Sequence, residues 1–476
     1  MAAPVVTGSV ALLMSAYPHL SSQQIVEILF RSANKSLPGW GEKDYLFDEY
    51  DNIIISDTIT QWTDSFGNSY DISSVYGHGM VDLKAATEPL GELKTPVGHS
   101  VDTKLPIANT RLSFPRRINI VDGEPVVENV LALDDYNRPF TTSVSGRIKH
   151  AFRNQNAFKR DFRSFMFKDK IQTAGKKDKL SFAFSSARTD RNLMGWGILD
   201  MNYQFNDTAA LKLSYRSDIL NENSIIDKAL SNPFMNMTDS YSVSQQLKWK
   251  DLAFTFGTTF GKNAFYETDD NRDDEFKKSV HAFNTEVAYR ANKYLTLKVV
   301  GGLLQEEEAL LGINGTGIFE TDDGETYYTG ATLEYQPIIP LTLSASYYYG
   351  RSSIPKTKAL VRIDDVISDS FAFDARYQYN ARDILGLQFS SPLRIRQGSA
   401  LFNLPIARDL YTDDVYFTQK KISLKPNARE YDLGLYYMTE TDNYDWRGEL
   451  MARFHPDHIS GIKPDYRALF GLSLKY

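Results

Sequence analysis

The chain has 476 residues, and none of them is cysteine. This absence excludes disulfide bonds, thiolate metal sites and cysteine nucleophiles together. The chain also lacks any run of 18 or more apolar residues, which argues against a membrane-spanning helix. Its formal net charge of −7 gives no excess of basic residues, so nucleic acid is not an expected partner.

The apolar N-terminus lacks the features of a secretory signal peptide. No basic segment precedes Ala2 to Tyr17, and no small-x-small cleavage site follows it. We therefore expect either that the true N-terminus lies elsewhere or that the chain is not exported in this form.

The final stretch, Tyr466 to Tyr476, alternates with a period of two, which is typical of a β-strand. One face is apolar, and the other is mostly small or charged. The apolar face ends at an aromatic residue, and its last four members form a candidate assembly signal for a membrane barrel: Phe470, Leu472, Leu474 and Tyr476.

Many upstream segments repeat this alternation. Leu341 to Tyr349 and Leu385 to Phe389 carry apolar residues at every second position. Short turns such as Arg382-Asp383 alternate with long polar loops such as Asp218 to Asp239 and Gln397 to Asn427, as in outer-membrane barrels. The pattern predicts a mainly β chain with an outer-membrane antiparallel β-barrel of about 12 to 14 strands.

Charged residues occupy the strand faces opposite the apolar rows. A soluble β-sandwich or propeller, the alternative fold, would carry fewer charges there, whereas a hydrated barrel lumen accommodates them. The residues predicted to face the lumen are Glu286, Arg290, Asp374, Arg376, Arg394, Arg396, Arg447, Glu449 and Arg453.

The first 90 residues have a helical pattern instead. Apolar periodicity predicts helices over Val5 to Tyr17 and Gln23 to Ala33, and Tyr76 to Asp82 forms a glycine-rich turn before Leu83. Met1-Ala2-Ala3-Pro4 resembles the end of the subtilisin-like protease motif Gly-Thr-Ser-Met-Ala-Ala-Pro. Tyr76 to Asp82 resembles the element before that family's last helix.

The resemblance implies a serine peptidase (S8) domain, but no catalytic residue of this chain. The family's nucleophilic serine would immediately precede Met1, and its Asp and His would lie further upstream. His19 and His78 have no discernible partners, and we assign neither a catalytic role. The chain as given is predicted to be inactive as a peptidase.

Frequent prolines in residues 91–177 indicate that this segment is a linker. Asp134 to Phe140 resembles the Asp-x-x-Gly-Arg-x-Phe segment that joins protease to barrel in subtilase autotransporters, with Asn137 at the expected glycine. Ser143 to Phe152 and Phe162 to Phe167 are candidates for a hairpin at the barrel entrance. A basic cluster around Lys168 to Lys179 fits either a solvated turn or contact with anionic lipid headgroups.

Metal and cofactor sites are not expected. Pro456 prevents the helical face that His455 and His458 would need to bind a metal together. The acidic clusters at Asp269 to Glu275 and Glu306 to Glu308 lack the spaced ligands and glycine of a calcium loop.

The chain as a whole resembles the C-terminal part of a subtilase autotransporter, with a subtilase remnant (1–90), a linker (91–177) and a barrel (178–476). The resemblance implies a translocator in the bacterial outer membrane whose protease passenger is at the cell surface or secreted. The implied partners are outer-membrane lipid and lipopolysaccharide, the barrel-assembly machinery, and the chain's own passenger or linker in the lumen. The alternative is a passive pore or adhesin barrel.

The C-terminal strand provides a first test. Deleting Tyr476, or changing Leu474 and Tyr476 to Asp, is expected to block insertion, because assembly machinery reads an apolar strand that ends in an aromatic residue. Membrane fractionation measures the effect. Normal membrane levels of the deletion variant would show that the signal lies elsewhere.

Overall fold

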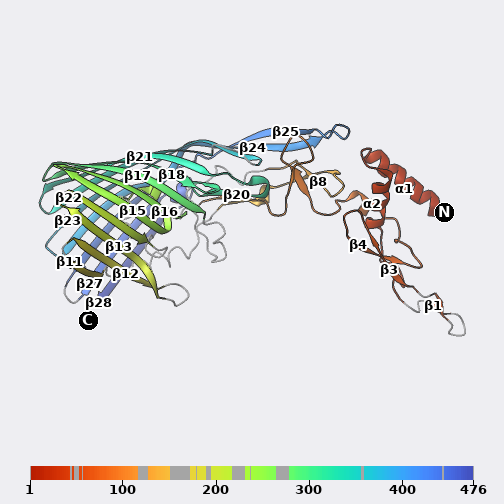
Figure 1. Ribbon diagram of the computed structural model, residues 1–476, viewed down its shortest axis with the longest axis horizontal. Coiled ribbons are helices and arrows are strands. Elements are labelled where there is room, and N and C mark those ends of the chain that lie inside the picture. Colours follow the sequence, from red (N-terminus) through yellow and green to blue (C-terminus); the bar gives the residue numbers. More distant parts are fainter. Residues whose placement is uncertain are drawn as a thin grey trace. The chain divides into compact units, whose positions relative to one another are not determined.

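The chain forms two compact units, shown in Figure 1. The computed structural model describes residues 2–42, 46–47, 53–55, 57–115, 127–150, 172–177, 179–188, 194–216, 231–235, 237–263, 278–354, 359–441 and 444–474. Unit 1 comprises residues 1–109, 127–144 and 403–418, and unit 2 comprises residues 110–126, 145–402 and 419–476. No described helix is long and apolar enough to cross a membrane.

Unit 2 is built around one large antiparallel sheet, whose strands curve into a barrel in Figure 1. Consecutive strands pair along the path β11 (Gln172–Lys177), β12 (Leu180–Arg188), β13 (Met194–Asn206), β14 (Ala209–Arg216), β15 (Met237–Trp249), β16 (Leu252–Asn263), β17 (Ser279–Asn292), β18 (Leu295–Glu306), β21 (Gly324–Ile338), β22 (Leu341–Ser353), β23 (Val361–Gln378), β24 (Asp383–Arg408), β26 (Tyr431–Glu440), β27 (Tyr444–Phe454) and β28 (Asp465–Leu474). A further strand, β25 (Val415–Ser423), pairs with β24 off this path.

The strand path is longer than the sequence pattern indicated. It has 15 strands, where about 12 to 14 and an even number were expected. One reason is β11, which pairs with β12 although it precedes residue 178, the predicted start of the barrel. Among the described residues, no strand pairing joins β11 to β28. The fold class is confirmed: the chain is mainly β, with an antiparallel barrel and a small helical part.

The burial of the two faces of the sheet is the reverse of that in a water-soluble protein, where the apolar face is buried and the polar face is exposed. On one face, Phe373 and Leu387 are 39% and 46% exposed. On the other, Asp374 and Gln388, which pair across β23 and β24, are each 1% exposed. A sheet that exposes its apolar side chains and encloses its polar ones has a closed, polar interior.

Unit 1 begins with the three helices α1 (Ala2–Ala16), α2 (Ser22–Ser32) and α3 (Leu83–Thr87). The helices predicted near residues 5–17 and 23–33 are confirmed. Ser21 begins α2 with a capping box, because its hydroxyl accepts from the N–H of Gln24 while the Gln24 side chain accepts from the N–H of Ser21. Asp82 caps α3 by accepting from the N–H of Ala85 at 3.0 Å.

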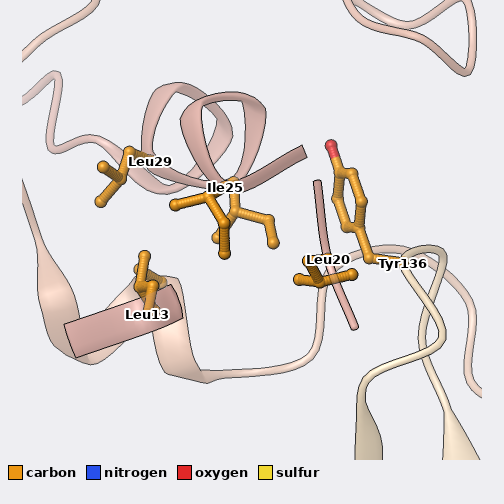
Figure 2. Close-up of a cluster of buried hydrophobic side chains, with 7 residues drawn as sticks. Leu13, Leu20, Ile25, Leu29 and Tyr136 are labelled. Atoms are coloured by element: carbon orange, nitrogen blue, oxygen red, sulfur yellow. The ribbon is translucent and has the colours of Figure 1, made fainter. Parts of the chain in front are cut away.

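The core of unit 1 joins these helices to a distant segment. Figure 2 shows Leu13, Leu20, Ile25 and Leu29 pointing toward one another and toward Tyr136. The Tyr136 side chain is 2% exposed, and its hydroxyl donates to Glu27 at 3.3 Å. Burial raises the pKa of Tyr136 to about 12, so the phenol stays protonated. Tyr136 therefore completes the core formed by α1 and α2 from a distant segment of the chain.

Small sheets complete unit 1. Two hairpins pair β1 (Leu46–Phe47) with β2 (Ile53–Ile55), and β3 (Ile59–Thr63) with β4 (Ser69–Ser73). A four-stranded sheet has the order β6 (Lys104–Pro106), β5 (Lys94–Pro96), β8 (Val130–Leu133) and β9 (Pro139–Thr142). Part of the segment read as a linker is thus folded, because Leu131 and Leu133 supply a buried face.

Another part of that segment pairs within unit 2. Strand β7 (Arg111–Phe114) lies between β10 (Ile148–His150) and β20 (Ile313–Thr316), and β19 (Ala309–Leu310) completes this sheet. Leu112 and Phe114 are fully buried. Ser143 to Phe152 is one half of the predicted entrance hairpin, and its strand β10 pairs in parallel with β7. Phe162 to Phe167, the other half of that prediction, and Lys168 and Lys170 lie outside the described residues.

The Asp134 to Phe140 segment is held by its charged residues. The Asp134 carboxylate accepts from the Arg138 Nε at 2.8 Å, and both side chains are fully buried. The Arg138 guanidinium also donates to the carbonyls of Ala86 and Glu88 at the end of α3. Asn137 has a φ of 59°, in the left-handed region that glycine adopts most easily. Asparagine tolerates that conformation better than most residues, so Asn137 can adopt the backbone geometry that a glycine would have at this position.

Position 137 gives a stability test with a matched pair of variants. Asn137→Gly and Asn137→Ala remove the same side-chain amide and differ mainly in their tolerance of a positive φ. Alanine is expected to destabilise the segment by about 1–2 kcal/mol relative to glycine. Hydrogen exchange of the amides in residues 130–142 measures the difference. Equal protection in both variants would show that the backbone does not hold this conformation in solution.

Candidate functional site in the barrel interior

Four of the predicted lumen residues come together on the polar face of neighbouring strands. The register pairs Arg376 with Gly386, Gly386 with Tyr436, and Tyr436 with Glu449, so that these positions form one row. Asp374 lies two residues from Arg376, and Arg447 two residues from Glu449. Because side chains alternate between faces, Asp374, Arg376, Arg447 and Glu449 all share this face.

Paired charges line this part of the wall. The Tyr436 hydroxyl donates to the Asp374 carboxylate at 2.9 Å, and Arg376 lies 3.6 Å from the other carboxylate oxygen. Arg447 and Glu449 are 3.1 Å apart. Tyr436 and Glu449 are 2% and 3% exposed. The charges largely cancel in pairs, leaving a polar wall without a dominant sign.

Arg453, the fifth predicted lumen residue, organises a second cluster. Its Nε donates to Glu430 at 2.7 Å. Three more carboxylates lie within 3.5 to 3.7 Å of the guanidinium: Asp432, Asp457 and Asp465. One arginine facing four carboxylates makes this end of the polar face acidic. The sequence showed Arg453 but not its partners, because they come from the residue before β26, from β26 and β28, and from the loop after β27.

His458 is held beside the same cluster by the backbone. Its Nδ1 accepts from the N–H of Glu430 at 2.8 Å, so its Nε2 is the atom that donates to the carbonyl of Leu393 at 3.0 Å. The ring is fully buried. His455 begins the intervening turn with a φ of 52°. The two histidines therefore do not present free ring nitrogens to a common point.

Glu286 and Arg290 lie elsewhere on the polar face. Both belong to β17, which is separated from β23 by β18, β21 and β22. Arg290 is exposed and pairs across the sheet with Thr296, which itself pairs with Glu334. Lys298 and Glu334 form an ion pair of 2.6 Å there. The polar face therefore carries a separate charged group near the short-turn end.

Arg394 differs from its predicted placement. The pairing of β23 with β24 shifts at bulges, and Arg394 lies opposite Asp369 instead of continuing the alternation from Gln388. Asp369 lies two and four residues before Phe371 and Phe373 on the same strand, so its side chain belongs to the same, apolar face. Arg394 thus belongs to the exterior side of the sheet. Arg396, also predicted in the lumen, is exposed, and it lies within the same irregular stretch.

Glycines on the polar face make room for tyrosine rings. A Cβ at Gly386 would overlap the ring of Tyr436, and one at Gly330 would overlap Tyr348. Each glycine is the cross-strand partner of the tyrosine concerned. The rings therefore lie flat over the neighbouring strand, and the strands pack closely at these points.

One loop contributes an apolar side chain to this face. The short helix η2 (Pro233–Met235) places Phe234, fully buried, in a stack with Tyr328 at 5.2 Å between ring centres. The Tyr328 hydroxyl donates to the Met235 sulfur at 3.4 Å. We expected a long polar loop over residues 218–239. In the sequence, the apolar pair Phe234-Met235 is the feature that could have indicated that part of this loop turns toward the polar face.

The C-terminal strand β28 pairs along its length with β27. Phe470 and Leu472 are 61% and 51% exposed, whereas Leu469 on the other face is 6% exposed. Leu474 is the last residue of the strand, and Tyr476 lies outside the described residues. Phe470 and Leu472 therefore have the exposure that a lipid-facing row requires.

The two histidines of unit 1 sit in packed surroundings. The His78 ring stacks on Phe30 at 3.6 Å and meets Trp62 edge-on. Burial lowers the pKa of His78, and the charge of Lys35 lowers it further. Burial and the charge of Arg408 likewise lower the pKa of His19. Their contacts are those of packed, neutral imidazoles.

Comparison with known proteins gives one family and several structures. Residues 1–79 match the Subtilase family (peptidase S8). No curated protein matches the chain. Among solved structures, outer-membrane expressed OmpT of Vibrio cholerae is 10% identical, covering 62% of this chain and 84% of that chain, with a TM-score of 0.35. Pseudomonas putida OprB is 11% identical, covering 62% and 81%, with a TM-score of 0.33. The Pseudomonas putida toluene transporter TodX is 10% identical, covering 66% and 88%, with a TM-score of 0.31.

The tyrosine-over-glycine packing predicts a specific loss of stability. Gly386→Ala forces its methyl group against Tyr436 and is expected to cost about 1–3 kcal/mol. Gly301→Ala is the matched control, because its Cβ would meet only a carbonyl oxygen at 3.8 Å. Urea unfolding of the folded barrel in micelles compares the two. Equal unfolding midpoints would show that the ring does not pack there.

Proposed function

We propose that unit 2 is an outer-membrane translocator barrel that exports or anchors an N-terminal subtilase-type passenger. The reversed burial of the sheet carries the membrane assignment. Apolar residues such as Val299, Phe373 and Leu387 are 45%, 39% and 46% exposed, at positions that alternate with enclosed polar ones. In water this surface would be costly, whereas hydrocarbon solvates it.

The translocator role is supported by the organisation of the chain. A segment similar to subtilases precedes the barrel, and a segment between them includes β7, a strand paired within unit 2. In this proposal the barrel interior accommodates the linker or passenger during export. A wall of mixed, paired charges suits a passing polypeptide, because it attracts neither positively nor negatively charged segments strongly.

The alternative, a wide passive pore, is less well supported. Phe234 and Tyr328 form an apolar stack on the polar face, and Tyr348 and Tyr436 lie flat against it. Bulky rings at these places reduce the cross-section open to water. The remaining proposed partners are the outer-membrane lipids, including lipopolysaccharide, and the barrel-assembly machinery that would insert β28.

Neighbouring positions on β18 test the membrane assignment. The chain has no native cysteine, so Val299→Cys and Lys298→Cys can each be labelled without background. In the structure the Val299 residue is 45% exposed and the Lys298 side chain 36%, so water alone would reach both. In liposomes, a small hydrophilic maleimide is expected to label position 298 at least tenfold faster than position 299, because hydrocarbon covers the apolar face.

Two further measurements make this result decisive. In urea both cysteines are expected to react equally, which shows that the reagent itself does not discriminate. If position 299 reacts as fast as 298 in intact liposomes, the apolar face is not in lipid, and the membrane assignment fails.

A further inference from the structure

A small charged group interrupts the apolar exterior of unit 2. Asp369 on β23 pairs with Arg394 on β24 across the bulged register, and Tyr349 on β22 pairs with Asp369. By alternation Asp369 lies on the same face as Phe373, which is exposed on the apolar side, and the bulge places Arg394 opposite Asp369 on that face. Charges on a lipid-facing side are costly unless they meet a partner there.

The Asp369 carboxylate has one basic partner in ion-pair contact. Arg429, just before β26, lies 3.2 Å from one of its oxygens and donates to the other at 3.3 Å. The Arg429 Nε also donates to the Ser391 hydroxyl at 2.8 Å. Asp369 is 4% exposed, and Arg429 contacts both of its carboxylate oxygens.

Arg394 receives no comparable compensation. Its Nη2 donates to the Pro426 carbonyl at 3.2 Å, while its buried Nε has no hydrogen-bond partner. The charged neighbours that act on it are Arg429, Asp369 and Arg396. Two half-buried arginines therefore share one carboxylate, and Arg396 adds positive charge nearby. The group has a net positive charge.

Aromatic rings frame the two arginines. The Arg429 guanidinium lies over the Phe371 ring at 5.0 Å, and Phe389 stacks on Tyr431 at 5.8 Å with the planes 7° apart. Aromatic rings beside basic groups are typical of the region where a barrel surface meets lipid headgroups.

The position along the strand agrees with that region. Asp369 lies nine residues before Gln378, the end of β23 at the short-turn side. Nine residues span roughly 30 Å along a strand, or about 23 Å along the axis of a barrel with the usual tilt. The apolar band of such barrels is about 25 Å tall. The charged group therefore lies at the long-loop boundary of the band, where headgroups begin.

We propose that Arg394 and Arg429, framed by Phe371, Phe389 and Tyr431, bind the phosphate of an anionic lipid headgroup in the leaflet on the long-loop side. A phosphate oxygen would accept from the half-buried Arg394 guanidinium and balance the excess charge, while the acyl chains would follow the apolar rows of β23 and β24. This inference rests on the proposed membrane location and adds a defined lipid site to it.

Native mass spectrometry of the full chain in micelles tests the proposal. The probes are phosphatidylglycerol and the zwitterionic phosphatidylcholine. We expect one retained phosphatidylglycerol on the wild-type protein and about fivefold lower occupancy on Arg394→Gln, the usual effect of one interfacial cation. This variant leaves the Arg429–Asp369 pair in place, so the fold should persist. Arg290→Gln is the control, since it removes one positive charge from the opposite face.

Each remaining outcome has a definite meaning. Equal phosphatidylglycerol occupancy in wild type, Arg394→Gln and Arg290→Gln would overturn the site. Equal retention of phosphatidylcholine would overturn its selectivity for anionic lipid. Displacement by millimolar inorganic phosphate would identify a site for free phosphate instead of a lipid. Failure of the wild-type chain to insert into liposomes in the labelling experiment would overturn the membrane proposal itself, which separates the two failures.

Discussion

The architecture of unit 2 depends on satisfying the backbone N–H and C=O groups of each strand through its neighbours. In lipid an unpaired backbone group costs several kcal/mol, so strands can cross a membrane only as part of a closed sheet. Along the described path every strand pairs antiparallel with the next, from β11 to β28. Where neighbouring strands pair in this way, side chains alternate except at bulges, and one face can be apolar while the other is charged.

The polar face uses that freedom in an organised manner. Asp374 is matched by Tyr436 and Arg376, and Glu449 by Arg447, so most charge is neutralised within or between adjacent strands. Arg453 is the exception, since several carboxylates surround one guanidinium. A wall built this way is polar, yet it has few strongly attractive points, as the proposed passage of a polypeptide requires.

The period of two in the sequence predicted the barrel and most face assignments, and the helical spacing of apolar residues predicted the helices of unit 1. Each of these depends on residues close together in the chain. The prediction failed where a distant partner decides the outcome. Arg394 lies on the exterior side because bulges in the pairing with β23 shift its register, and no local pattern reveals a bulge. Likewise, β7 forms because β20, about two hundred residues later, offers it an edge.

The tyrosine rings that lie over Gly330 and Gly386 have a consequence for how this protein can evolve. A larger residue in place of the glycine meets the ring, and loss of the tyrosine leaves a void above the glycine. Neither member can drift independently, because each single replacement is penalised. Such pairs should change together or not at all. In related barrels, a substitution at the glycine position should therefore be accompanied by one at the tyrosine position on the adjacent strand.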